Sequence, residues 1–267
     1  MCSWPGASAA DSDRTITIKG SDTMVILAQR WIEAYGKARP GTRIQLTGGG
    51  SLTGTAALVN HTTDIAAASH ALREHEIARA EARVGRKLRR IPVALDVLTI
   101  FVHPSNPIEA LTLPQLHAIL TGKVTRWSEV GGPDRPIAVY GREASSGTYW
   151  LLKEIVLGED DFAPHIESLP GTGAVVDSVS KDPGGLGYGG IAYEHGLRHV
   201  KIKQDDAAPA IEGNAETARS GAYGLARTLY LYTFEPLPPE VEEFVGWTLA
   251  PDGQAVVRTV GYYPIAR

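Results

Sequence analysis

The order strand, polar turn, helix occurs three times in this chain, and it limits the possible folds more than any other feature. Each unit joins a short apolar strand to an amphipathic helix through a turn of glycine and hydroxyl residues. The three units occupy residues 15–35, 44–59 and 137–157. In the first, apolar residues from Met24 to Tyr35 recur at the spacing of one helical face. Strands that alternate with helices predict an α/β fold with largely parallel sheets.

Further strands and helices continue this alternation along the chain. We predict strands at residues 64–69, 93–102 and 228–233 and helices at residues 73–84, 113–120 and 241–249. The helix 73–84 is densely charged and is expected to be a solvated face, and the helix 241–249 is expected to be the last element. With 267 residues the chain is long enough for two domains of ordinary size.

The turn at residues 141–148 has the composition of an anion-binding site. It places Ser145, Ser146, Thr148 and Arg142 between an apparent strand and an apparent helix. A helix that begins near Ser146 directs unpaired N–H groups and the positive end of its dipole at the turn. Arg142 adds a planar fork of donors that matches a tetrahedral oxyanion.

The overall charge gives no reason to expect nucleic acid or an anionic membrane as a partner. Lys and Arg total 26 against 30 for Asp and Glu, a formal net charge of −4, so a bound anion has to be held by local donors. No apolar run approaches the roughly 18 residues of a membrane helix. Cys2 is the only cysteine, which excludes an internal disulfide and a cysteine-based metal cage. We expect neither a cofactor nor a metal.

The start of the chain is open to two interpretations. Cys2 follows Met1 directly and leads into a tail of Ser, Ala and Asp residues. This arrangement resembles the start of a mature bacterial lipoprotein whose signal peptide has been replaced by methionine. The alternative is a start codon followed by an arbitrary disordered segment. Both interpretations make residues 1–13 a flexible tail.

Taken together, the polar turns resemble those of the periplasmic substrate-binding proteins of bacterial phosphate ABC transporters. The four turns that carry the resemblance lie at residues 20–24, 48–54, 64–69 and 142–148. Other segments typical of the family match at residues 111–116, 122–127, 131–133, 173–176 and 183–188. Any one match is weak, but their common order along nearly the whole folded chain is specific.

The resemblance implies a two-lobed periplasmic-binding-protein fold of the Venus-flytrap type (type II), with two crossing strands as the hinge. Lobe one would comprise residues 14–97 and 231–267, and lobe two residues 98–230. The hinge strands would lie at 97–102 and 227–233. Carried over position by position, the phosphate site would consist of Ser21, Asp22, Thr23, Met24, Ser51 and Ser69 from lobe one and Arg142, Ser145, Ser146, Gly147 and Thr148 from lobe two.

Two positions depart from the family pattern in ways that affect the choice of anion. Ser69 stands where many relatives carry an aspartate that accepts the remaining proton of phosphate, although a hydroxyl can also accept. Asp22 and Glu143 are the nearest other acceptors; their alternative roles are a helix cap and a partner of Arg142, respectively. His70 stands where relatives often carry arginine, and we expect it at the surface.

Other functional classes find little support. Ser145 replaces a common glycine and is expected to cap the next helix. Ser145 and Ser146 lack the Gly-x-Ser-x-Gly context and a suitably spaced base, so a catalytic nucleophile is not expected. The histidine and glutamate residues at 70–76 do not form His-Glu-x-x-His. The glycines at 185–190 lack the flanking strand and helix of a dinucleotide loop, which predicts a turn at a sheet edge.

The sequence thus predicts a non-catalytic, extracytoplasmic monomer that binds inorganic phosphate and delivers it to the permease subunits of an ABC transporter. Arg142 would supply the main positive charge. Two alternatives remain open at this stage. One is a binder of another tetrahedral oxyanion, such as sulfate or molybdate, and the other is a phosphate sensor that acts through a protein partner without transport.

Overall fold

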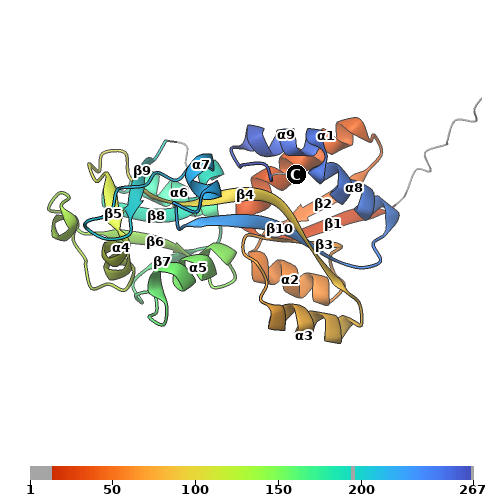
Figure 1. Cartoon of the computed structure of the whole chain (residues 1–267), viewed down its shortest axis with the longest axis horizontal. Coiled ribbons are helices and arrows are strands. Elements are labelled where there is room, and N and C mark those ends of the chain that lie inside the picture. Colours follow the sequence, from red (N-terminus) through yellow and green to blue (C-terminus); the bar gives the residue numbers. More distant parts are fainter. Residues whose placement is uncertain (1–13, 194–195, 266–267) are drawn as a thin grey trace, which may run out of the picture.

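The computed structural model of the chain describes residues 14–193 and 196–265. Figure 1 shows two lobes side by side, with two long strands passing between them. The flexible tail predicted for residues 1–13, and Cys2 within it, lie outside the described residues.

Lobe one is a sheet covered by helices on both faces (Figure 1). Its parallel strands are, in order across the sheet, β2 (Arg43–Thr47), β1 (Thr15–Gly20) and β3 (Ile65–Ala68). One face carries α1 (Val25–Ala38), α8 (Pro239–Leu249) and α9 (Pro251–Val260), and the other carries α2 (Ser51–Val59) and α3 (Glu74–Val84). The strands and helices predicted for residues 15–84 are confirmed.

The strand β3 shows why this part of the sequence is a continuous apolar run. All four of its residues are buried. Ile65 and Ala67 pack into the core that contains Trp31, whereas Ala66 and Ala68 pack into a separate core on the other face. Successive side chains of a strand point to opposite faces, so a strand covered on both sides needs apolar residues at every position.

The two strands that join the lobes are β4 (Leu88–Val102) and β10 (Ala226–Phe234). They run antiparallel, with Val97 opposite Ala226 and Leu88 opposite Phe234. Beyond Val97, β4 pairs with a strand of lobe two, while β10 also pairs with β3 of lobe one. The prediction of largely parallel sheets is therefore correct within the lobes and wrong for these two strands, which run antiparallel to their neighbours.

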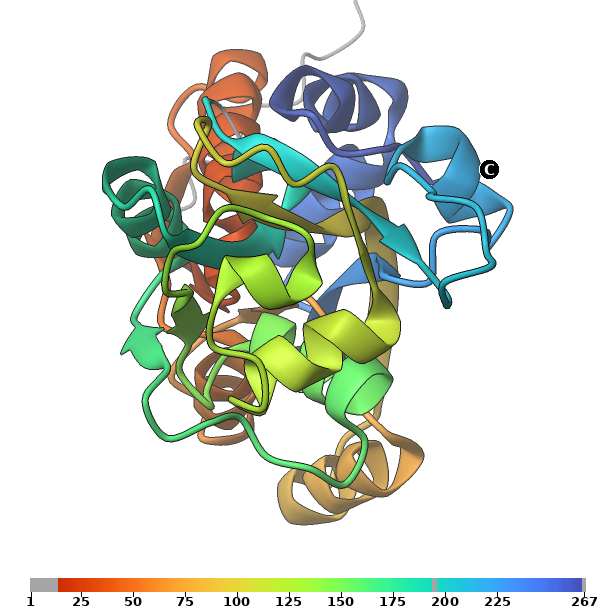
Figure 2. The same ribbon diagram turned by 90° about the vertical axis from the view of Figure 1, so that its left-hand side faces the viewer.

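Lobe two faces the viewer in Figure 2. Its strands are β5 (Ala110–Thr112), β6 (Ala138–Arg142), β7 (Glu167–Leu169), β8 (Gly185–Gly190) and β9 (Arg198–Lys203). Its helices are α4 (Leu113–Leu120), α5 (Gly147–Leu152), α6 (Thr172–Lys181) and α7 (Ala215–Arg219), with short helical turns at Trp127–Val130, Lys153–Leu157 and Ile191–Tyr193. The core surrounds the fully buried Trp127, whose indole N–H donates to the carbonyl of Gly184 at 2.9 Å.

The glycine-rich segment of lobe two corrects one prediction. Gly185–Gly190 is not a turn at a sheet edge but the buried strand β8, paired on one side with β4 and on the other with β6. A Cβ at Gly187 would lie 2.6 Å from the ring of Phe101, and one at Gly189 would lie 2.7 Å from the methyl group of Thr172. The missing side chains let Phe101 and helix α6 pack directly onto the strand.

The C-terminal end of the chain corrects the prediction that the helix 241–249 is the last element. The helix predicted at 241–249 is present as α8 but is followed by α9, which begins at Pro251. Proline suits the first position of a helix because its missing N–H has no intrahelical partner there. The α9 helix is tied to lobe one by Trp31, whose indole N–H donates to the carbonyl of Gly253 at 2.9 Å.

None of the helices in the described ranges combines the length and the apolar character that crossing a bilayer requires.

Replacement of Trp31 by alanine tests this packing. The side chain is 1% exposed and links α1 to α9. We expect Trp31→Ala to lower the free energy of unfolding by about 3–5 kcal/mol, because it leaves a large cavity and removes the hydrogen bond to Gly253. Urea unfolding followed by circular dichroism measures the change. Lys37→Ala, at an exposed position of the same helix, is the control. Equal stability of the two variants would contradict the packing described here.

Candidate functional site

Four hydroxyl side chains from separate turns meet between the lobes. The Oγ1 atoms of Thr23 and Thr148 are 3.1 Å apart, and the Oγ atoms of Ser51 and Ser69 are 3.4 Å apart. All four residues are buried. Thr23, Ser51 and Ser69 come from lobe one, and Thr148 comes from the start of α5 in lobe two. The structure thus brings together side chains that the sequence placed in four different turns; their contact with an anion remains a prediction. We call these four residues the hydroxyl cluster.

The first turn is shaped by the close approach of β1 and β3. Gly20 ends β1 at a φ of +145°, and a Cβ there would lie 2.1 Å from the carbonyl oxygen of Ala67. The N–H of Ser21 donates to that same oxygen at 2.8 Å, and the N–H of Met24 donates to the carbonyl of Ser21 at 3.0 Å. The Met24 N–H that we expected to bind the anion is therefore engaged within its own helical turn, Asp22–Met24.

Two tyrosines that the sequence did not single out hold the same turn in place. The hydroxyl of Tyr262 donates to the carbonyl of Thr23 at 2.6 Å, and that of Tyr193 donates to the carbonyl of Asp22 at 2.7 Å. Burial raises the pKa of Tyr193 to about 12 and that of Tyr262 well above its ordinary value, so both remain hydrogen-bond donors at neutral pH.

The start of α2 lies against lobe two through backbone contacts. The N–H of Leu52 donates to the carbonyl of Ser145 at 3.1 Å across the lobes. Gly50 precedes the helix at a φ of +91°, and a Cβ there would lie 2.4 Å from the same carbonyl oxygen. Glycine is needed at this position both for the left-handed conformation and for the approach of Ser145.

The start of α5 is capped by Ser146. Its Oγ accepts hydrogen bonds from the N–H groups of Thr148 at 3.1 Å and Tyr149 at 3.4 Å. The prediction that Ser145 caps this helix is wrong, because Ser146 is the extended residue directly before the first helical turn. Its hydroxyl accepts two bonds and still has a proton to donate. Ser145 instead contributes its carbonyl to the contact between the lobes.

Gly147 stands at the point where α5 approaches lobe one. A Cβ at this residue would lie 2.6 Å from Oγ of Ser51, 2.7 Å from Oγ of Ser69 and 2.6 Å from Nδ1 of His70. Three polar atoms of lobe one therefore converge on one small volume beside the backbone of Gly147.

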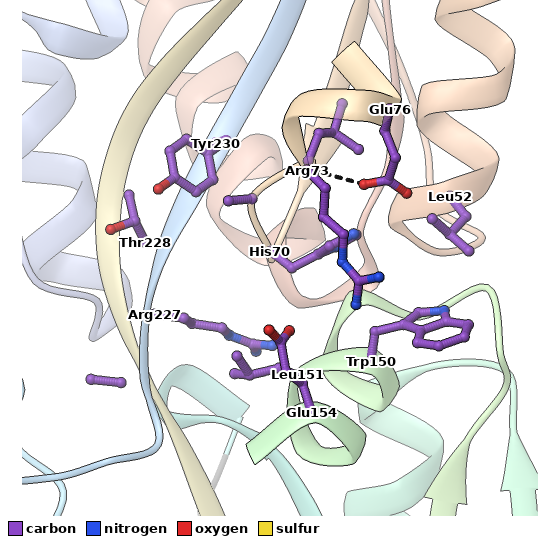
Figure 3. A pocket seen from close by; sticks show the side chains of 13 residues that line it. Leu52, His70, Arg73, Glu76, Trp150, Leu151, Glu154, Arg227, Thr228 and Tyr230 are labelled. Carbon is purple, nitrogen blue, oxygen red and sulfur yellow. Dashed lines mark hydrogen bonds between the residues drawn. The ribbon is translucent and has the colours of Figure 1, made fainter. Parts of the chain in front are cut away.

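The position of His70 corrects the prediction of a surface histidine. Its ring lines a pocket bounded by both lobes (Figure 3), and its Nδ1 is buried without a hydrogen-bond partner among the described residues. Burial lowers the pKa of its imidazole.

Arg142 connects lobe two to lobe one through an ion pair. Its side chain is 2% exposed, and its Nη2 donates to Oδ2 of Asp22 at 2.6 Å. Nη1 donates to the hydroxyl of Thr172 at 2.8 Å. Asp22 is thus the partner of Arg142 rather than a helix cap, and its other oxygen accepts from the N–H of Gly49. The alternative in which Glu143 pairs with Arg142 is not borne out, since Arg142 pairs with Asp22 and Glu143 is exposed.

The charge of Arg142 is incompletely compensated. Its Nε is buried, and no described atom accepts a hydrogen bond from it. Burial lowers the pKa of the guanidinium, although the carboxylate of Asp22 opposes this effect. A buried donor on a cation favours a nearby anion, because desolvation without a partner is costly.

A second guanidinium, which sequence reasoning missed, holds hydroxyls of both lobes. Nη1 of Arg227 donates to Oγ1 of Thr148 at 2.9 Å, and Nη2 donates to Oγ1 of Thr23 at 3.3 Å. Its Nε donates to Oδ2 of Asp96 at 2.8 Å. These two charged residues face each other on β10 and β4. The signal in the sequence that could have revealed them was an aspartate within the otherwise uncharged stretch 91–102 and an arginine at the start of the otherwise uncharged strand β10.

The ion pair of Asp96 and Arg227 is buried at the centre of the molecule. Asp96 is fully buried and Arg227 is 5% exposed. Burial raises the pKa of the Asp96 carboxyl, and the adjacent guanidinium opposes this rise. The N–H of Ile191 also donates to Asp96, at 3.2 Å. A buried pair of this kind needs such additional hydrogen bonds to offset its desolvation.

A metal site is not indicated in residues 14–193 and 196–265. No group of three or more His, Cys, Asp or Glu side chains is placed there to hold a metal ion. Glu76 instead accepts a hydrogen bond from the N–H of Arg73 at the start of α3. The chemistry of the site is that of hydroxyl and guanidinium donors converging from two lobes, which suits a tetrahedral oxyanion.

Comparison with known proteins gives the family. Residues 5–252 match the PBP superfamily domain. The chain is 35% identical over 263 residues to the phosphate-binding protein PstS of Pseudomonas aeruginosa, an alignment that covers 92% of this chain and 81% of the relative. The chain belongs to the PstS-like family of the PBP superfamily.

Solved structures agree with this assignment. A Clostridium perfringens protein assigned as a phosphate ABC transporter substrate-binding protein, solved with bound phosphate, aligns with a TM-score of 0.86 at 26% identity and covers 95% of this chain and 100% of its own. An ABC-type phosphate transport receptor of Vibrio cholerae aligns with a TM-score of 0.73, also at 26% identity, over 94% and 100% of the two chains. The two-lobed periplasmic-binding-protein fold implied by the sequence is confirmed.

Removal of the carboxylate of Asp96 tests the central ion pair of this PstS-like protein. We expect Asp96→Ala to lower the free energy of unfolding by about 3–5 kcal/mol, because it leaves the Arg227 guanidinium buried without its counter-charge. Chemical unfolding measures the effect. Asp177→Ala is the matched control, since it removes an aspartate from an exposed ion pair with Lys181 and should change stability little. A small effect at Asp96 would show that the pair is not the structural centre described here.

Proposed function

We propose that this chain binds inorganic phosphate between its two lobes and delivers it to the permease of an ABC transporter. The observation that carries the proposal is the meeting of hydroxyls from both lobes beside the two buried guanidiniums of Arg142 and Arg227. The names of the relatives, which are phosphate-binding and phosphate-transport proteins, support the same ligand.

The donors of the site match what a buried phosphate needs. An anion that leaves water has to recover its hydration through many short hydrogen bonds. The hydroxyl cluster can supply four of them, and Nε of Arg142 supplies a charged donor that has no partner in the described structure. The first turns of α2 and α5 add backbone N–H groups and positive dipole ends. The proposed ligand set is Ser21, Asp22, Thr23, Ser51, Ser69, Arg142, Ser145, Ser146, Gly147 and Thr148, to which we add Arg227. Met24 is left out because its N–H is engaged within its own turn.

The distribution of these groups over two lobes couples binding to closure. An anion that contacts both lobes favours the conformation in which they meet, and so shifts the population toward it. We propose that the moving bodies are residues 14–97 with 231–267 and residues 98–230, with β4 and β10 as the hinge, and that the permease subunits bind the closed form. Within this proposal the protein is an extracytoplasmic monomer without catalytic activity, and Cys2 is its point of lipid attachment.

Calorimetry with phosphate, sulfate and molybdate tests the ligand directly, and Arg142→Gln tests the site. Phosphate is expected to give the tightest binding. Loss of the guanidinium charge and its hydrogen bonds is expected to weaken phosphate binding by about 100-fold or more. Arg135→Gln, an exposed position in the same lobe, should leave the affinity unchanged. Undiminished affinity in the Arg142 variant, or a preference of the wild type for sulfate, would contradict the proposal.

Gly147→Ala tests whether closure is required. The added methyl group would lie under 3 Å from Ser51, Ser69 and His70, so the lobes could not close around the anion. We expect phosphate affinity to fall by about 100-fold or more while the free energy of unfolding stays the same or rises, since alanine favours a helix more than glycine does. Gly173→Ala, in the first turn of α6 with open space around it, is the control. Normal binding by the Gly147 variant would rule out this mode of closure.

A further inference from the structure

His70 is the group of the site whose hydrogen-bonding capacity is left unused. It follows β3, and its ring lines a pocket of about 480 Å³ between the lobes (Figure 3). Its Nδ1 is buried and has no partner in the described parts of the chain. A single point, the Cβ position of an alanine at residue 147, lies within 2.7 Å of this nitrogen and of the Oγ atoms of Ser51 and Ser69. The nitrogen therefore belongs to the same converging set as the two serine hydroxyls.

The charges around His70 come from three directions and oppose one another. Arg73 and Glu76 stand at the start of α3, Glu154 belongs to the turn Lys153–Leu157, and Arg227 lies on β10. Burial is the main cause of the lowered pKa of His70; Arg227 and Arg73 lower it further, whereas Glu76 and Glu154 raise it. The imidazole is therefore neutral at pH 7, and one of its nitrogens has a lone pair.

The charged groups of the site offer no free acceptor, and its hydroxyls can either donate or accept. Arg142 and Arg227 can only donate hydrogen bonds. The carboxylates of Asp22 and Asp96 are already paired with these two arginines. Arg142 Nε and His70 Nδ1 thus remain as an unpartnered donor and an unpartnered nitrogen that can accept, which suits a ligand with several acceptor oxygens and one hydroxyl.

We propose that neutral His70 accepts, through Nδ1, the hydrogen bond of the hydroxyl that bound hydrogen phosphate retains. The inference rests on the proposed phosphate-binding function and adds to it the residue that selects the ligand. In the tautomer required, the proton lies on Nε2. Sulfate is fully ionised near neutral pH and has no hydroxyl, so beside the tautomer with the proton on Nε2 its oxygen would face a lone pair and leave a buried acceptor unsatisfied; the selection requires that the imidazole keep this tautomer. Such a mismatch weakens binding by roughly 10- to 100-fold.

The selection depends on pH in a defined direction. Protonation of His70 turns Nδ1 into a donor, which removes the repulsion of sulfate. Because the pKa of His70 lies below its ordinary value, this change occurs on the acid side of about pH 6.5. Sulfate keeps the same charge over this range, so its affinity reports the protonation of the protein without a change in the ligand.

The test is calorimetry with phosphate and with sulfate at about pH 7.5 and about pH 5. The wild type should prefer phosphate at the higher pH, and its affinity for sulfate should rise about tenfold once the pH falls below the lowered pKa of His70. His70→Lys, which can only donate, should bind sulfate better at pH 7.5 and lose the preference. His70→Asn carries both an acceptor and a donor and does not titrate, so its affinity for sulfate should be the same at both pH values. His75→Asn, at an exposed position on α3, is the control for loss of a histidine.

A second measurement uses the wild-type protein alone, so it does not require any variant to fold. Nitrogen-15 chemical shifts of His70 in the phosphate-bound wild type should show Nδ1 unprotonated and Nε2 protonated at about pH 7.5. A protonated Nδ1, or an unchanged preference for phosphate in a folded His70→Lys protein, would overturn the role of His70 while leaving phosphate binding intact. A wild type that binds no phosphate at either pH would overturn the proposed function, and this inference with it.

Discussion

The buried ion pair of Asp96 and Arg227 is the interaction on which the rest of the site depends. It lies where the two connecting strands face each other, and through Arg227 it reaches a hydroxyl of each lobe. A buried charge pair contributes little net stability, but losing one partner is costly. The pair therefore fixes a geometry more than it adds stability: Thr23 and Thr148 are held by the same rigid fork, and the anion site is built around that fork.

The sequence predicted the elements of the fold that depend on residues close together in the chain. Helical spacing from Met24 to Tyr35 and the glycine turns before α2 and α5 identify elements and hydroxyl positions without knowledge of the tertiary structure. What the sequence could not show depends on neighbours distant in the chain. Gly185–Gly190 became a strand because Phe101 and α6 pack onto it, and Arg227 became functional only through its register with Asp96.

His70 is another residue whose position in the site the sequence could not show. A polar residue after a buried strand is usually exposed, but the approach of Gly147 from the other lobe helps to bury Nδ1 of this imidazole. Three kinds of group thus have three different roles in the proposed site. Arginines carry charge, hydroxyls adapt as donors or acceptors, and the imidazole supplies an acceptor that can be withdrawn by protonation.

The long strand β4 affects how the chain folds. Its fifteen residues complete the sheet of one lobe at one end and that of the other lobe at the other end. A fragment that ends at Val97 would lack β10, which lies between β3 and β4 in the sheet of lobe one, and would expose strand edges that invite aggregation. We therefore regard the protein as two lobes that move relative to each other when ligand binds, but as a single unit in folding.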